Sequence, residues 1–179
     1  AKAQLIAATY EEKRKPICLI TYNEIQAKQI VKNLSYFLND VKYFPKREIA
    51  AYDYDAESND IEYDRIEILN NIYNKKAKII VTTIEAVMQK MISKDVLYQN
   101  ILKLKIGDTI NHDSLKNKLV QNGYKRVDLI ENRGEFSVRG DIVDTGIAEN
   151  EGIRIEFWGD DVDSIRTFRI SSQRSNEMI

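Results

Sequence analysis

The chain has 179 residues and nearly balanced charge, with 27 Lys and Arg against 28 Asp and Glu and a net charge of −1. Hydrophobic residues make up 43% and charged residues 31%, which is typical of a soluble globular protein with one large domain or two small ones. A protein that holds DNA mainly through its phosphates would carry a clear basic excess, so the composition disfavours that class for the chain as a whole.

Cysteine and histidine are too scarce for several kinds of site. Cys18 is the only cysteine, which excludes an internal disulfide and suits a reducing compartment. His112 is the only histidine, so a structural zinc site is not expected. No apolar run reaches the roughly 20 residues of a membrane-spanning helix, and no signal peptide is visible. We therefore expect a cytoplasmic module without a bound metal or cofactor.

The first 92 residues alternate helical and strand-like segments. Short apolar strands are predicted over 17–21, 41–44 and 77–82, and Cys18 is expected to be buried in the first. Helices are predicted over 1–13 and 24–38, after a cap at Asn59 or Asp60, and after a cap at Thr83. This order indicates an α/β layer with a parallel sheet covered on both faces.

The helices of this half carry apolar residues at helical spacing, which predict the faces that they bury. The stripes are Ile25, Ile30, Leu34, Phe37 and Leu38 in the second helix, Ile61, Ile68, Leu69 and Ile72 in the third, and Ile84, Val87, Met88 and Met91 in the fourth.

After Ser93 the pattern changes to that of a small α+β domain with an antiparallel sheet. The stretch 101–106 (ILKLKI) alternates apolar and basic residues, as a strand with one solvated face does. Asn111 is the expected cap of a helix that buries Leu115 and Leu119 and ends at Gly123. Strands are predicted over 124–130, 135–144, 153–158 and 162–168, and the tail from Ser171 is polar and looks unfinished.

One tripeptide imitates a catalytic motif. The segment 142–146 (IVDTG) matches the loop that carries the catalytic carboxylate of aspartic proteases, with Asp144 as the candidate. Such an enzyme needs two carboxylates about 3 Å apart that share a proton, and the charged turn after Gly146 does not continue the protease pattern. We interpret the match as a coincidence.

Other catalytic and metal sites are also disfavoured. No G-x-x-x-x-G-K-[ST] phosphate loop occurs, although residues 1–5 could follow such a loop, and no apolar strand ends in an Asp-Glu pair. The acidic residues Asp53, Asp55, Glu57 and Asp60 read as a solvated loop. His112 reads as an exposed residue at a helix start, with no triad around it.

The arginines of the second half give a more informative pattern. Alternation places Arg139 on one face of its strand, and Arg154 and Trp158 together on one face of theirs. If the two strands are neighbours, the three side chains form one exposed patch of the residue types enriched at binding hot spots. The alternative left open by the pattern is that the two arginines pair with Glu135 and Glu156 across strands.

The motifs of this half resemble a known family. GEFSVRGDIVD, IRIEFWGDDVDSIRTF and SQRS occur in the order found in the UvrB-like module of the bacterial transcription-repair coupling factors, the Mfd family. The stretches GYKRVDLI, VTTIEAVMQK and AKAQLIA extend the resemblance over nearly the whole chain, and the acidic YDYDAESNDIEYDRI favours this family over UvrB. The chain departs from the pattern at Thr145-Gly146-Ile147, where a remodelled loop is expected, and at Arg169.

The resemblance implies a non-catalytic adaptor of transcription-coupled nucleotide excision repair. Residues 1–92 would be the first part of a degenerate RecA-like domain, 93–168 a UvrA-binding domain, and 169–179 the start of a segment that returns to the RecA-like domain. Arg139, Arg154 and Trp158 would contact UvrA, which the full protein recruits to stalled RNA polymerase. RNA polymerase and DNA would be bound downstream, where the ATP-driven motor lies. The alternative is a truncated UvrB-type helicase subunit.

Overall fold

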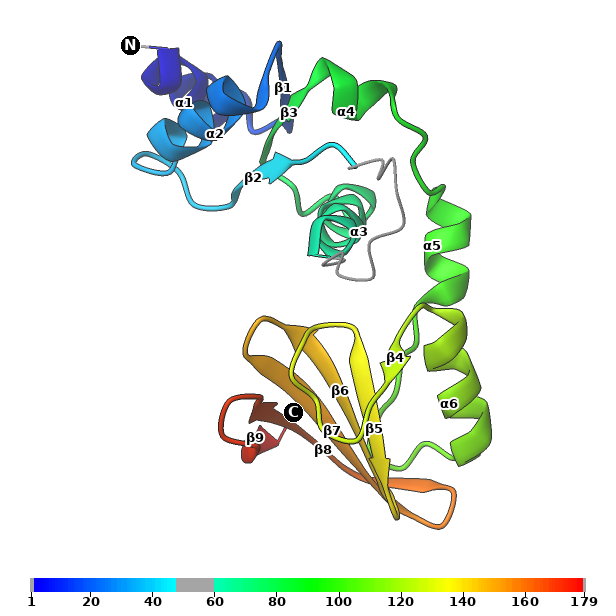
Figure 1. The fold of residues 1–179 in the computed structure, drawn as a ribbon. Coiled ribbons are helices and arrows are strands. Elements are labelled where there is room, and N and C mark those ends of the chain that lie inside the picture. The colour runs from blue at the N-terminus through cyan, green and yellow to red at the C-terminus, as the bar shows by residue number, and fades with distance from the viewer. Residues whose placement is uncertain (1, 48–59, 179) are drawn as a thin grey trace. The chain divides into compact units, whose positions relative to one another are not determined.

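The computed structural model describes residues 2–47 and 60–178, and the chain divides into two compact units, Ala1–Tyr98 and Gln99–Ile179 (Figure 1). The acidic residues Asp53, Asp55 and Glu57 lie outside the described residues. Within the described part, no helix is long and apolar enough to cross a membrane.

The first unit is built on a parallel three-stranded sheet. Its strands β1 (Ile17–Thr21), β2 (Val41–Phe44) and β3 (Ile79–Thr83) have the order β1-β3-β2, which confirms the three predicted strands. Helices α1 (Lys2–Lys13) and α2 (Glu24–Leu34) pack on one face through Ala7, Ala27 and Leu34. Helix α3 (Asp60–Tyr73) packs on the other face through Ile68 and Leu69. The mixed α/β class predicted for this half is confirmed.

The helix caps predicted at Asn23 and Thr83 are correct, but the helix predicted over 24–38 ends at Leu34. Asn23 caps α2 by accepting from the Gln26 N–H, and Thr83 caps α4 (Ile84–Met88) by accepting from the Ala86 N–H. The predicted apolar stripes are only partly buried. Exposed members are Ile25, Phe37, Ile72, Ile84, Val87, Met88 and Met91.

The expectation that Cys18 is buried is wrong. In β1 the side chains of Ile17 and Leu19 pack against the α1–α2 cluster, whereas Cys18 and Ile20 point to the other face and are exposed. The reason is position in the sheet, because β1 is an edge strand and β3, at the centre, is the strand that is buried on both faces.

The second unit is a six-stranded sheet with one helix packed on one of its two faces. Helix α5 (Lys94–Asn100), which the sequence did not predict, precedes it. The sheet order β4-β5-β6-β7-β8-β9 comprises β4 (Lys125–Arg126), β5 (Glu135–Arg139), β6 (Ile142–Ala148), β7 (Glu151–Trp158), β8 (Asp161–Arg169) and β9 (Arg174–Met178). All neighbours are antiparallel except β4 and β5, which confirms a separate, mostly antiparallel sheet.

Helix α6 (His112–Gln121) closes the main core of this unit. Asn111 caps it by accepting from the Asp113 and Ser114 N–H groups, as predicted, and Leu115 and Leu119 are buried against the sheet. The main core also contains Phe136, Val143, Ile155, Phe157, Val162 and Ile165. The opposite face of the sheet carries a smaller cluster of Ile130, Phe168 and Ile170.

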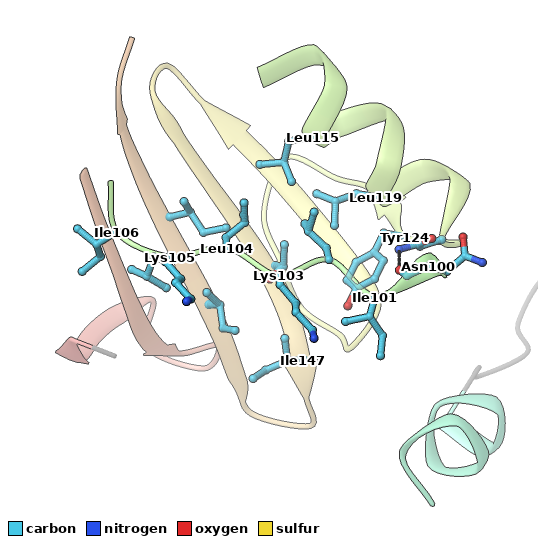
Figure 2. A pocket seen from close by; sticks show the side chains of 16 residues that line it. Asn100, Ile101, Lys103, Leu104, Lys105, Ile106, Leu115, Leu119, Tyr124 and Ile147 are labelled. Carbon is cyan, nitrogen blue, oxygen red and sulfur yellow. Dashed lines mark hydrogen bonds between the residues drawn. The ribbon is translucent and has the colours of Figure 1, made fainter. Parts of the chain in front are cut away.

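The segment 101–106, predicted to be a strand, is irregular and crosses over the α6 face of the sheet (Figure 2). Leu102 and Leu104 pack against the core while Lys103 and Lys105 are exposed, so the alternation is real but the pairing is not. A segment that lies over a sheet face cannot pair with an edge strand. It lines an apolar groove of about 860 Å³ between Leu119 of α6 and Ile147 of β6 (Figure 2).

Candidate protein-interaction site

A tight hairpin between β5 and β6 presents Arg139. Phe136 is buried in the core and Val138 packs against it, so Arg139 lies on the opposite face of β5. The chain reverses at Gly140 and Asp141, where Gly140 has a φ of +58°, which glycine adopts without steric cost. The single strand predicted over 135–144 is therefore wrong, because this stretch spans two antiparallel strands.

Strand β6 separates the strands that carry the two arginines. Arg139 is on β5 and Arg154 on β7, so the condition that these strands be neighbours is not met. Asp144 on β6 is directly opposite Ser137 of β5 and Arg154 of β7. Opposed residues of antiparallel strands share a face, and Arg139 is two residues beyond Ser137, so all three charged side chains lie on the same face.

Asp144 is a buried carboxylate that both arginines hold. Its Oδ1 accepts from Arg154 Nε at 2.8 Å, and its Oδ2 accepts from Arg154 Nη2 at 2.9 Å and from Arg139 Nη2 at 2.8 Å. The side chain of Asp144 is 1% exposed, that of Arg154 15% and that of Arg139 50%. Two guanidinium groups thus compensate one buried charge through ionic hydrogen bonds.

Arg154 is fixed on several sides. Its Nη1 donates to Ser175 Oγ of β9 at 3.1 Å, and its guanidinium lies 5.1 Å from the centre of the Phe168 ring. The hydrogen bond to Asp144 raises the pKa of Arg154, against an opposing effect of desolvation. The contacts of Arg154 are therefore made within the protein, whereas half of the Arg139 side chain is exposed to solvent.

Trp158 is the large exposed aromatic of this face. It ends β7, is 80% exposed, and is preceded by Phe157, which is buried in the main core. Glu156 pairs with Ile142, which pairs with Arg139, and Trp158 is two residues further along β7. Two strand spacings and two residues separate Arg139 from Trp158, about 10 Å across the sheet and about 7 Å along it. We call Arg139, Asp144, Arg154 and Trp158 together the arginine–tryptophan face.

The alternative pairing of the arginines with Glu135 and Glu156 is wrong. Glu156 accepts from Ser164 Oγ at 2.8 Å and lies 3.6 Å from Arg166. Glu135 accepts at 2.8 Å from the backbone N–H groups of Glu131 and Asn132. Both glutamates have other partners. Asp144 is the carboxylate that contacts both arginines.

The pH dependence of Glu135 is testable. Desolvation raises the pKa of Glu135, but hydrogen bonds from Glu131 and Asn132 outweigh it and lower the pKa below that of a free glutamate. A lowered folded-state pKa contributes stability that is present above about pH 4.3 and is lost as the pH falls through the folded-state pKa. Glu135→Gln should therefore be less stable than wild type at about pH 7, and thermal unfolding should show the difference shrinking with acidification. A difference that grows in acid would contradict this.

The Asp-Thr-Gly tripeptide has a structural role. It lies in strand β6, whose pairing with β7 shifts register between Gly146 and Ala148, so Thr145 and Gly146 belong to a strand and not to the connecting loop expected there. A Cβ on Gly146 would be 2.3 Å from the Asn132 carbonyl oxygen, so the close passage of that segment requires glycine. Asp144 is buried and ion-paired, unlike a proton-sharing catalytic carboxylate.

The remaining candidates lack catalytic surroundings. His112 is half-buried, not exposed as expected, and its ring lies 4.3 Å from that of Phe157. Desolvation raises the pKa of the Cys18 thiol, which is opposite to the shift that activates a thiolate. Among residues 2–47 and 60–178, no group of three or more His, Cys, Asp or Glu side chains could hold a metal ion.

The unit that carries the arginine–tryptophan face matches an interaction-domain family. The sequence model of the UvrB interaction domain matches residues 102–179, which include all six strands of the sheet. This class of protein-binding domain accords with a face whose exposed side chains are an arginine and a tryptophan.

The whole chain is similar to transcription-repair-coupling factors. It is 32% identical to that of Bacillus subtilis (strain 168) and 30% identical to those of Staphylococcus aureus (strain Mu50 / ATCC 700699) and Staphylococcus epidermidis (strain ATCC 12228 / FDA PCI 1200), with 100% of the chain aligned. The chain spans 16% of the length of each of these relatives. The resemblance found in the motifs is confirmed.

Proposed function

We propose that the chain is a non-catalytic protein-interaction module of transcription-coupled nucleotide excision repair, and that its second unit binds UvrA. The observation that carries the proposal is the arginine–tryptophan face, on a unit that matches the UvrB interaction domain. The names of the relatives favour this function over the alternative of a truncated UvrB-type helicase subunit.

We extend the proposal to the rest of the protein. The first unit would be part of a RecA-like domain without ATP hydrolysis, supported by its parallel sheet with helices on both faces and by the absence of a phosphate-loop motif from the sequence. The full protein would act in the cytoplasm and recruit UvrA to stalled RNA polymerase. RNA polymerase, DNA and the ATP-driven motor would belong to segments outside these 179 residues.

Two substitutions test the UvrA contact. Arg139→Glu reverses an exposed charge and Trp158→Ala removes an exposed aromatic, so each should weaken UvrA binding at least about 30-fold while the fold is retained. Isothermal titration with purified UvrA measures the affinity, and circular dichroism checks the fold.

Matched controls lie away from the face. Lys105→Glu reverses an exposed charge on the α6 side of the sheet, and Tyr36→Ala removes an exposed aromatic from the first unit. Both should bind UvrA as wild type does. Wild-type affinity of Arg139→Glu and Trp158→Ala would reject the assigned surface, and ATP binding by the chain would favour the helicase alternative.

A further inference from the structure

The two arginines that share Asp144 differ in how much of their hydrogen-bonding capacity remains available. Arg154 directs Nε and Nη2 to Asp144 and Nη1 to Ser175, and little of it is exposed. Arg139 directs only Nη2 to Asp144, and its side chain is half exposed. A guanidinium has five N–H groups, so Arg139 keeps N–H groups that can meet another molecule.

We propose that Asp144 is the positioning residue of the arginine–tryptophan face. It holds the Arg139 guanidinium in a fixed orientation, on the same face of the sheet as Trp158, so that the free N–H groups meet a carboxylate on the partner. This deepens the proposed function and rests on it, because it names the chemistry by which the same surface recognises UvrA. Arg154 acts through Asp144 and mainly keeps that carboxylate in place.

Asp144 can position Arg139 because Asp144 is itself buried and hydrogen-bonded. It lies on β6, near the middle of the sheet, and its carboxylate is bridged to Arg154, which Ser175 and the Phe168 ring hold in turn. A long arginine side chain otherwise loses about 2 kcal/mol of rotamer entropy when a partner immobilises it. An arginine that is already held binds with a smaller loss.

The ion-paired side chains that include Arg139 favour an acidic partner group. Asp144 neutralises one of the two arginines that it contacts, and Glu156 lies beside Arg166, so these five ion-paired residues together keep one net positive charge. The exposed end of that charge is the planar guanidinium of Arg139, whose fork of donors matches a carboxylate. Trp158 would supply a separate apolar contact on the same face of the sheet.

A double-mutant cycle on UvrA affinity tests the proposal. Asp144→Asn keeps the side-chain shape but loses the charge and, in either amide orientation, at least one of the three hydrogen bonds. We expect it to weaken UvrA binding about 10-fold in the wild-type background and less than about 2-fold in the Arg139→Gln background. Equal losses in both backgrounds would mean that Asp144 supports only the fold, and this would overturn the proposal.

Arg139→Lys provides a second variant, which does not disturb the buried pair. Lysine keeps the positive charge but has no planar fork, so UvrA affinity should also fall about 10-fold. Wild-type affinity of Arg139→Lys would show that charge alone matters and would overturn the proposal.

A readout without UvrA separates this inference from the proposed function. Nitrogen NMR of the Arg139 guanidinium should show restricted rotation in the wild-type protein and free rotation in Asp144→Asn. Free rotation in the wild-type protein would reject the positioning role. Restricted rotation together with no wild-type binding of UvrA would reject the proposed function, and with it the partner assigned to Arg139.

Discussion

Asp144→Ala should destabilise the second unit by about 3–5 kcal/mol, because it leaves the largely buried guanidinium of Arg154 without its carboxylate. The loss includes a bidentate ionic hydrogen bond at 2.8 and 2.9 Å in a site from which water is mostly excluded. Chemical denaturation of the wild type and the variant, followed by far-ultraviolet circular dichroism, measures the difference. A loss below about 1 kcal/mol would show that Arg154 finds an equivalent partner.

Arg139→Ala is the matched control for this prediction. Arg139 contacts the same carboxylate, but its side chain is half exposed, so its loss should cost no more than about 1 kcal/mol. Replacing both buried partners, as in Asp144→Leu with Arg154→Met, should cost less than Asp144→Ala, because no uncompensated charge remains. The burial of each partner, not the number of ion pairs, therefore sets the expected cost.

The local sequence pattern predicts the strands of the first unit and the helix caps of both units. The short apolar runs at 17–21 and 41–44 are β1 and β2 with the predicted bounds. The caps at Asn23, Thr83 and Asn111 were also correct, because a cap is a contact between residues two or three positions apart.

Features that depend on sheet position were not predicted. Cys18 is exposed because β1 is at an edge, and strand order follows from tertiary pairing that one sequence does not state. Strand β9 was missed for the same reason, since its residues RSNEM show no apolar alternation and pair with β8 only in the assembled sheet. Helix α5 is a short element of seven residues, for which periodicity is a weak signal.

The sequence contains a signal for the position of Asp144, the residue at the centre of the candidate site. A Gly-Asp pair at 140–141 between apolar segments is typical of a hairpin turn, and it would have placed β6 beside β5. Asp144 then falls on a strand inside an apolar run, and a buried carboxylate requires a cationic partner. Strand alternation identifies Arg139, Arg154 and Trp158, whereas the residue that joins the two arginines lies in the tripeptide that imitates a protease motif.

Phe168→Ala should also lower stability by about 3–5 kcal/mol, because Phe168 is fully buried at the centre of the smaller cluster. Its ring packs with Ile130 and Ile170 and lies under the guanidinium of Arg154. Phe168→Leu keeps part of the volume and should cost clearly less than Phe168→Ala. Equal losses in the two variants would mean that the ring itself, and not filled volume, determines the stability.

Gly152 offers an internal check on this packing. A Cβ on Gly152 would be 2.3 and 2.4 Å from two atoms of the Phe168 ring, so Gly152→Ala should be destabilising in the wild-type protein. In the Phe168→Ala background the ring is gone, so the same Gly152→Ala change should cost less, and thermal unfolding of the four proteins gives the coupling. The remaining cost would come from the Thr145 carbonyl oxygen, 2.8 Å from the same Cβ position. Strictly additive losses would contradict a direct contact between Gly152 and the ring that supports Arg154.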